Sequence, residues 1–386
     1  FCSMILADMG ADVIKIERPR TGDLARTRGP FIKSEDGRET SSRFLGVNRN
    51  KRSVSINLGN PRCKEAFEEL VRNSDVLVDN WGSGAFSRLG LGYEHLRKIN
   101  PGLVYASITG YGASEGLTGP YSARPANNLA IQAMSGWMEI TGDPDGPPQS
   151  VGDNIGDSIP GVWTALGIVL ALETRRQTGQ GQYVDMAMYE CMVAHIESNM
   201  NFFQATGSNP ARSIDRFATA GITFEAKDGY VVLAGLRTEA RMRDLWTLIG
   251  REDLLEGDAR YLAGPGMDGQ FYYEHIIPTI EVWSSQLGKF EVAAKLTEIG
   301  FSMGVTQTMA DLDVCPQLNA RQMFIETGDT LGGKFRGVKT PARLTACIDS
   351  PTKTPPQLGE HNEEILCSLG GMTSEEVAVL TAEGVL

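Results

Sequence analysis

Short apolar segments alternate with amphipathic helical segments along the first half of the chain, and this alternation constrains the fold more than any other feature. The spacing of apolar residues predicts helices over 1–9, 64–72 and 93–99 and strands over 13–16, 75–79 and 103–108. Helices over 126–139, 158–176 and 189–204 and a strand over 183–186 continue the pattern. Strands that alternate with helices across short links are typical of a parallel sheet covered by helices. We therefore expect a large α/β domain over residues 1–205.

The pattern changes after residue 205. Two alternating runs within 218–235 are joined by Lys227, Asp228 and Gly229, which indicates a tight hairpin because Asp-Gly tolerates positive φ angles. Helices are expected over 239–248, 272–283 and 288–299. These elements predict a smaller α+β domain over 206–325. The Pro-rich run near 351–361 predicts an extended strap, which with a final helix makes up 326–386.

Composition excludes several classes of protein. The longest mostly apolar run, 162–172, is shorter than the roughly 20 residues that a membrane helix needs, so we expect no membrane span. A formal net charge of −12 disfavours a general binder of nucleic acid or anionic membranes, because phosphate would be repelled at long range. Six scattered cysteines in a chain of 386 residues indicate reduced thiols and a cytoplasmic location.

Motifs for metal ions and common nucleophiles are missing from the sequence. The four histidines are far apart, and none has the spacing of a zinc site, so we expect no metal. The sequence also lacks the defining glycine loops of serine hydrolases, P-loop proteins and dinucleotide-binding proteins.

Basic residues are concentrated between Lys15 and Arg52. This window holds 11 basic and 5 acidic residues, a net charge of +6 inside an acidic chain. Arginine offers fork-shaped donors for phosphate, so the cluster suits a compact phosphate-bearing ligand. A solvated basic loop would have the same composition.

Asp157 precedes a strongly apolar helix, with Ser158 beside it and Pro160 close behind. This pattern predicts that Asp157 is a helix N-cap. A carboxylate beside the free N–H groups of a helix start is also expected to stay ionised, which covalent acyl transfer through an anhydride requires. Asp153, four residues earlier, is the alternative candidate for this nucleophilic carboxylate.

Five separate segments resemble one family over nearly the whole chain. They are ADMGADVIKIERP, NRNKRSVSINL, SDVLVDNWGSGAFSRLGLGYEHLRKINPGLVYASITGYG, GDPDGPPQSVGDNIGDSIPGVWTALGIVLALETRRQTGQGQYVDMAMYE and PPQLGEHNEEIL. In this order they resemble the class III CoA-transferases, the CaiB/BaiF family. Against the family pattern the chain starts one strand late.

The resemblance implies an open Rossmann-like parallel-sheet domain, a smaller α+β domain and a homodimer of two interlocked rings. It implies transfer of CoA from an acyl-CoA donor to a free carboxylic acid, with Asp157 forming first an anhydride and then an aspartyl-CoA thioester. The CoA thioester is a substrate, and no permanently bound cofactor is implied.

The resemblance also implies the residues that bind CoA. Arg18 matches the residue that meets the adenosine-phosphate end, and Ile56, Asn57 and Leu58 match the adenine side. Asn80, Trp81 and Arg88 match the next CoA-contacting segment, and Arg124 is taken as the replacement of a nearby lysine of the family. Arg18 and Arg88 could instead form surface ion pairs, and Leu58 and Trp81 could be core residues.

Two alternatives stay open. Racemases of 2-methylacyl-CoA share the fold and use a histidine with the aspartate, but the matching position here is Asn127, which cannot exchange a proton at neutral pH. A non-catalytic CoA-binding subunit of a heteromeric transferase is the other alternative, and the retained Asp157 argues against it.

The sequence also departs from the family pattern in one loop. Some members carry a run of glycines over the catalytic aspartate, whereas the matching segment 208–221 has no such run. The sequence specifies neither the donor nor the acceptor acid.

Overall fold

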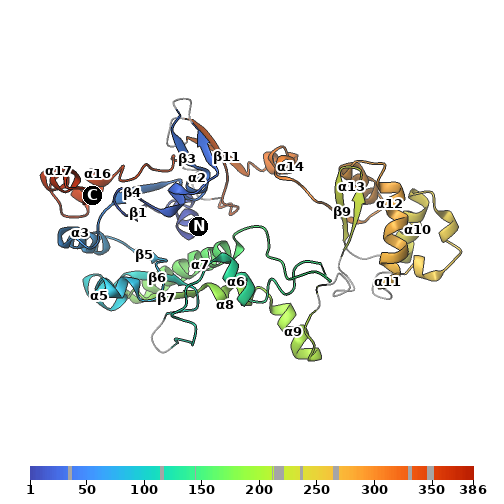
Figure 1. Ribbon diagram of the computed structural model, residues 1–386, viewed down its shortest axis with the longest axis horizontal. Helices are drawn as coiled ribbons and strands as arrows, with labels where there is room; N and C mark the ends of the chain where they lie inside the picture. The colour runs from blue at the N-terminus through green and yellow to red at the C-terminus, as the bar shows by residue number, and fades with distance from the viewer. Residues whose placement is uncertain are drawn as a thin grey trace. The chain divides into compact units, whose positions relative to one another are not determined.

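The chain forms two compact units in a computed structural model that describes residues 1–33, 37–113, 117–143, 145–210, 212, 221–234, 238–263, 269–328, 333–345 and 352–386. Unit 1 comprises residues 1–138, 150–198 and 317–386, and unit 2 comprises residues 139–149 and 199–316 (Figure 1). The boundaries at 205 and 325 that the sequence suggests stay a prediction.

Two parallel sheets form the centre of unit 1. In the first sheet β1 (Val13–Glu17) pairs with β4 (Lys51–Ser55), with Glu17 opposite Ser55. In the second, β5 (Val76–Asp79), β6 (Val104–Thr109) and β7 (Tyr183–Ala187) lie in that order. The α/β class expected from the sequence is confirmed. Strand β4 was not expected, because its buried face carries Lys51, Ser53 and Ser55 instead of apolar side chains.

Helices and short hairpins complete unit 1. The helices are α1 (Cys2–Asp8), α2 (Ser42–Asn48), α3 (Pro61–Arg72), α4 (Ala85–Arg88), α5 (Tyr93–Ile99), α6 (Asn128–Met134), α7 (Ile155–Thr178), α8 (Met188–Ala194), α16 (Asn362–Ser368) and α17 (Ser374–Ala382). A 3₁₀ turn, η1 (Leu24–Thr27), follows β1, and two hairpins form from β2 (Phe31–Lys33) with β3 (Glu39–Ser41) and from β11 (Phe324–Gly328) with β12 (Lys334–Val338). Helices α9 (Glu197–Thr206) and α15 (Pro316–Ala320) lie at the unit boundaries.

The hydrophobic core of unit 1 joins the two ends of the chain. Phe67 and Leu70 of α3 pack in one cluster with Ile365 and Leu366 of α16, and Val54 of β4 belongs to the same cluster. In Figure 1 the C-terminal helices accordingly lie beside the first strands. A run of chain far from β1 in sequence thus becomes part of the same domain.

Helix α7 is the longest helix of the described chain. Its length and apolar composition would allow it to cross a membrane, a property that core helices of soluble proteins share. One side of α7 buries Ala165, Ile168 and Ala171 in a core with Val104 and Ala106 of β6. Helix α7 covers one face of the second sheet, and it extends beyond the predicted helix 158–176 at both ends.

Unit 2 is built on a three-stranded antiparallel sheet. Strand β9 (Gly229–Ala234) lies between β8 (Ile222–Ala226) and β10 (Ser302–Val305), and the β8–β9 turn at Asp228 and Gly229 confirms the predicted hairpin. Its helices are α10 (Glu239–Leu248), α11 (Gly269–Phe271), a π-helical turn η5 (Tyr272–Ile276), α12 (Ile277–Ser284), α13 (Lys289–Glu298) and α14 (Met309–Asp313), with 3₁₀ turns η3 (Glu252–Leu254) and η4 (Ala259–Tyr261). The core of this unit includes the fully buried Trp246.

Candidate functional site

Asp157 lies at the end of α7 that points past the carboxyl ends of the second sheet. At the other end of the helix, Arg175 donates to the carbonyl oxygen of Gly102 at 3.1 Å and pairs with Asp75 at 2.8 Å, and both partners precede the strands β6 and β5. A helix of 24 residues is about 36 Å long, whereas a five-residue strand spans about 17 Å. The first turn of α7 therefore reaches beyond the carboxyl edge, where open α/β sheets bind their ligands.

The structure corrects the expected role of Asp157 in the helix. The N-cap is Asn154, helix α7 begins at Ile155, and Asp157 is the third residue of the first turn, so the N-cap prediction is wrong. Within the described part of the chain, no hydrogen bond engages the Asp157 carboxylate, and the residue is exposed. A carboxylate that is not used in capping is available to a ligand.

The surroundings of Asp157 shift its ionisation. Partial desolvation by the neighbouring protein raises the pKa of its carboxyl above the ordinary value. The net shift is upward, opposite to the effect that a helix start alone would have. The rival Asp153 differs, because one of its carboxylate oxygens accepts the backbone N–H of Asn154 at 2.7 Å.

The start of α7 is fixed by a close contact with α6. The backbone N–H of Gly156 donates to Oδ1 of Asn128 at 2.9 Å, and Gly156 is buried against that residue. The amide of Gln132 holds the preceding loop, since it accepts from the N–H of Val151 at 2.9 Å and donates to the carbonyl oxygen of Asp153 at 3.3 Å. Sequence reasoning missed Asn128 and Gln132, because only the packing of two helices shows that they hold the Asp157 turn.

Asn127 serves as the N-cap of α6. Its Oδ1 accepts the backbone N–H of Ala130 at 3.0 Å. The residue adjoins Asn128 and therefore lies at the same helix junction as Asp157. Its side chain has a structural partner, and an amide neither gains nor loses a proton near neutral pH, so it cannot act as a catalytic acid or base.

Arg18 and the segment 56–58 lie together at the carboxyl edge of the first sheet. The backbone N–H of Ile56 donates to the carbonyl oxygen of Glu17 at 3.0 Å, which extends the pairing of β1 with β4. Arg18 and Asn57 are exposed, whereas Ile56 and Leu58 are buried in the core. Ile56 and Leu58 can thus reach a ligand only through backbone atoms.

Asn80, Trp81 and Arg88 follow β5 at the carboxyl edge of the second sheet. The N–H of Trp81 donates to Oδ1 of Asp79 at 3.2 Å, and the Trp81 ring lies 4.8 Å from the ring of Phe86. Trp81 is 44% exposed, so it is not the core residue that the sequence allowed. Asn80 and Arg88 are exposed as well, and Phe86 shares one core cluster with Leu58.

A buried carboxyl supports this corner. Asp79 accepts a hydrogen bond from the hydroxyl of Tyr105 at 2.8 Å. Burial raises the pKa of Asp79, and the hydrogen bonds from Tyr105 and the Trp81 backbone oppose that shift. Asp79 therefore fixes the turn that presents Trp81.

Arg124 lies in the loop between β6 and α6. Its guanidinium stacks over the Tyr121 ring at 4.0 Å, and Tyr121 contacts Tyr111 at 5.7 Å between ring centroids. The stacking leaves the donor edge of the exposed guanidinium open to an anion.

Several basic residues of the window between Lys15 and Arg52 are held in ion pairs. Ion pairs join Lys15 to Asp23, Arg26 to Glu17, and Arg49 to Asp8. Arg52 pairs with both Asp12 and Glu364. Among the residues that the structure describes, none gives the Arg18 guanidinium a hydrogen bond or an ion pair. Arg18, which follows the last residue of β1, therefore keeps its charge available for a ligand.

Three further predictions concern metal ligands, the cysteines and the segment 208–221. Over the described ranges, no group of three or more His, Cys, Asp and Glu side chains could hold a metal ion. Cys2, Cys63, Cys191 and Cys367 carry free thiols, as the scattered spacing predicts. Most of the segment 208–221 lies outside the described residues.

Comparison with known proteins gives consistent results over nearly the whole chain. Residues 1–362 match the family model "CoA-transferase family III". The chain is 36% identical over 375 residues to a succinyl-CoA:mesaconate CoA-transferase of Haloarcula marismortui, covering 96% of this chain and 92% of the relative. It is 32% identical to a succinyl-CoA–D-citramalate CoA-transferase of Chloroflexus aurantiacus, covering 100% and 94%. The crystal structure of a CaiB/BaiF family protein from Brucella suis superposes with a TM-score of 0.85 at 33% identity, covering 95% of this chain and 94% of that one.

Proposed function

We propose how this chain, which belongs to CoA-transferase family III and is a CoA-transferase, carries out the transfer: the Asp157 carboxylate is the nucleophile that accepts the acyl group and then CoA. The observation that carries this proposal is the free carboxylate of Asp157 in the first turn of α7, beyond the carboxyl edge of the sheet. A carboxylate becomes a covalent catalyst when it is aimed at an acyl carbon and is not consumed by a structural partner.

The first half of the reaction loads CoA onto the enzyme. An oxygen of Asp157 attacks the thioester carbonyl of the donor, the C–S bond breaks, and the products are a mixed anhydride and the CoA thiolate. The thiolate then attacks the aspartyl carbonyl of the anhydride and displaces the donor acid as a carboxylate. An aspartyl-CoA thioester remains.

The second half repeats these steps in reverse order. The acceptor carboxylate attacks the aspartyl carbonyl and expels the thiolate, which gives a second mixed anhydride. The thiolate attacks the acyl carbon of the acceptor, so the new acyl-CoA leaves and the Asp157 carboxylate is restored. Each step exchanges one acyl bond for another, so no electron or net proton is transferred.

The two carboxyl edges supply the groups for CoA. We assign Arg18 to the adenosine-phosphate end of CoA and the backbone of 56–58 to its adenine side. Arg88 and Arg124 are exposed guanidiniums that suit the remaining phosphate oxygens, and Asn80 and Trp81 complete the edge. Long-range screening by salt should weaken these contacts.

The names of the relatives suggest the first substrates to try. Two of them are named for succinyl-CoA as donor and for mesaconate or D-citramalate as acceptor. These acceptors are small dicarboxylic acids, so we infer that succinyl-CoA and a small dicarboxylic acid are the substrates of this chain.

The decisive experiment traps the enzyme intermediate. The protein is incubated with succinyl-CoA alone, quenched with hydroxylamine or borohydride, and digested for peptide mass spectrometry. A modification at Asp157 is expected, and it should be absent from Asp157→Asn but present in the matched control Asp153→Asn. A modification at Asp153 would overturn the assignment, and exchange of the α-proton of a 2-methylacyl-CoA without any adduct would favour the racemase alternative.

We also propose that the chain acts as a cytoplasmic homodimer through α7. The face of α7 opposite the core exposes four apolar side chains at helical spacing, Val162, Leu166, Val169 and Leu170, which are 46–59% exposed. A continuous apolar stripe of this kind is typical of a surface that a partner covers. Light scattering should give a dimer mass for the wild-type protein, whereas a monomer of unchanged activity would remove this proposal.

A further inference from the structure

The loop that carries Arg18 closes around the side chain of Glu17. Strand β1 ends at Glu17, and the chain then reverses, since the N–H of Gly22 donates to the carbonyl oxygen of Arg18 at 3.0 Å. Neighbouring residues at the end of a strand point to opposite sides. Glu17 is accordingly buried while Arg18 is exposed. Glu17 therefore lies inside the turn whose outer surface presents Arg18.

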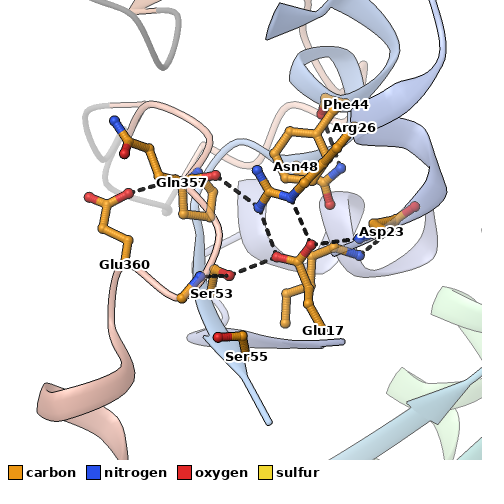
Figure 2. Close-up of polar contacts among 12 residues, drawn as sticks. Glu17, Asp23, Arg26, Phe44, Asn48, Ser53, Ser55, Gln357 and Glu360 are labelled. Atoms are coloured by element: carbon orange, nitrogen blue, oxygen red, sulfur yellow. Dashed lines mark hydrogen bonds and ion pairs between the residues drawn. The ribbon is translucent and has the colours of Figure 1, made fainter. Parts of the chain in front are cut away.

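The Glu17 carboxylate has four hydrogen-bond donors around it (Figure 2). Arg26 forms a fork, with Nε donating to Oε2 and Nη2 donating to Oε1, both at 2.8 Å. The hydroxyl of Ser53 donates to Oε1 at 2.7 Å, and the backbone N–H of Asp23 donates to Oε2 at 3.0 Å. Both carboxylate oxygens are thus satisfied by groups of the loop 18–26 and of β4.

The charge of this carboxylate is stabilised where it is buried. Burial alone would raise the pKa of Glu17, but hydrogen bonds from Arg26 and Ser53 and the charge of Arg26 outweigh it and lower the pKa. The ion pair is shielded from water, since the Arg26 and Glu17 side chains are 16% and 1% exposed. Removal of one partner from such a pair leaves a buried charge without compensation.

The same pair fastens the C-terminal strap, defined as residues 352–360. The guanidinium of Arg26 stacks on the Phe44 ring at 3.7 Å, and its Nη2 donates to the carbonyl oxygen of Pro356 at 3.1 Å. Ser53 completes the closure, because its hydroxyl accepts the N–H of Gly359 at 3.0 Å. The network therefore joins three segments that are far apart in sequence.

We propose that Glu17 is a positioning residue of the CoA site, which holds the loop 18–26 so that Arg18 meets a phosphate of CoA. This inference rests on the proposed role of Arg18 in CoA binding. A guanidinium binds phosphate strongly only when its fork is presented at a fixed place, so a loosened loop weakens the contact although Arg18 itself is unchanged. Asp157 lies on a different element and keeps its chemistry.

The test is a comparison of kinetic constants in Glu17→Gln. We expect the KM for succinyl-CoA to rise about tenfold, the scale of a lost hydrogen bond to a charged group, while kcat changes by less than about threefold. Should Glu17→Gln fail to fold, Ser53→Ala removes one bond to Glu17 and keeps the ion pair. A rise in KM of about twofold to threefold is then expected.

A double-mutant cycle distinguishes positioning from general loosening. If Glu17 acts through Arg18, Glu17→Gln should leave the KM of Arg18→Ala nearly unchanged. A full further rise in that background would overturn the inference. Asp8→Asn is the matched control, because Asp8 forms a comparable buried carboxylate fork, with Arg49 Nε at 2.9 Å and Nη2 at 2.5 Å. It should lower stability with no change in KM, and an equal rise in KM would also overturn the inference.

Failure of the underlying proposal would look different. If Arg18→Ala binds CoA as tightly as the wild-type protein, Arg18 is not a CoA contact, and the role of Glu17 falls with it. The trapping experiment at Asp157 does not depend on either residue, so it tests the transfer mechanism separately.

Discussion

Substitution of Gly156 by alanine should separate catalysis from stability in this protein. A Cβ at Gly156 would lie 2.8 Å from the carbonyl oxygen and 2.9 Å from Oδ1 of Asn128, and the first of these atoms is backbone. Ordinary carbon–oxygen contacts in packed interiors need roughly 0.5 Å more than this, so the starts of α6 and α7 must move apart. Gly156 has helical backbone angles, so alanine adds no conformational strain of its own.

The expected magnitudes follow from these opposing effects. Overpacking of a tight contact costs about 1–3 kcal/mol, and the higher helix propensity of alanine returns about 1 kcal/mol. We therefore expect the free energy of unfolding to fall by about 0–2 kcal/mol. Because Asp157 is the next residue, it moves with Gly156. A displacement of about 1 Å costs on the order of 100-fold in rate, so a shift of half that size should lower kcat about tenfold.

The assay combines urea denaturation with steady-state transfer from succinyl-CoA. The matched control is Gly167→Ala on the same helix, where the new Cβ would lie 3.0 Å from a methyl carbon of Val184, far along α7 from Asp157. The control should lose comparable stability and keep kcat within about threefold. If both variants lose activity in proportion to their loss of stability, Gly156 does not set the position of Asp157.

Three further outcomes are expected. Asp157→Asn should abolish CoA transfer and leave the free energy of unfolding at pH 7 equal or higher. Burial raises the pKa of Asp157, so ionisation of this carboxyl disfavours the folded state as the pH rises. A clear loss of stability in urea denaturation would contradict this expectation. Arg18→Ala should weaken CoA binding about tenfold in calorimetry, and the binding constant should depend less on salt concentration. A salt dependence equal to that of the wild-type protein would contradict the assignment of Arg18 to a CoA phosphate. Glu17→Gln should lower the free energy of unfolding by about 3 kcal/mol at pH 7. The difference from the wild-type protein should shrink as the pH falls through the lowered pKa of Glu17, because protonation removes the carboxylate charge from the wild-type protein as well. A difference that does not depend on pH would contradict an ionised Glu17–Arg26 pair.

The local pattern of the sequence was enough to predict many elements. Helix α5 occupies the range expected from apolar spacing, and α10 and the hairpin of β8 with β9 do as well. Periodicity depends on neighbours within a few residues, so it can be recognised without knowledge of the fold. The same reasoning joined α8 and α9 into one helix, because the break near His195 carries no proline or glycine.

The candidate site was predictable only in outline. The resemblance to a family pointed to Asp157 and to the arginines, but the exact start of α7 depends on its contact with Asn128, so the predicted cap was displaced by three residues. Burial of Ile56 and Leu58 follows from the packing of α3 and α16 over β4, which no local signal contains.

The sequence by itself determined the alternation of strands and helices, the apolar character of α7 and the presence of an acidic residue at its start. Tertiary structure alone decided which charges remain free for a ligand. Arg52 pairs with Glu364, and Arg26 meets Pro356, although these partners are more than 300 residues apart. The physical reason is that helix and strand patterns arise from short-range repetition, whereas neutralisation of a charge depends on which distant segment packs against it.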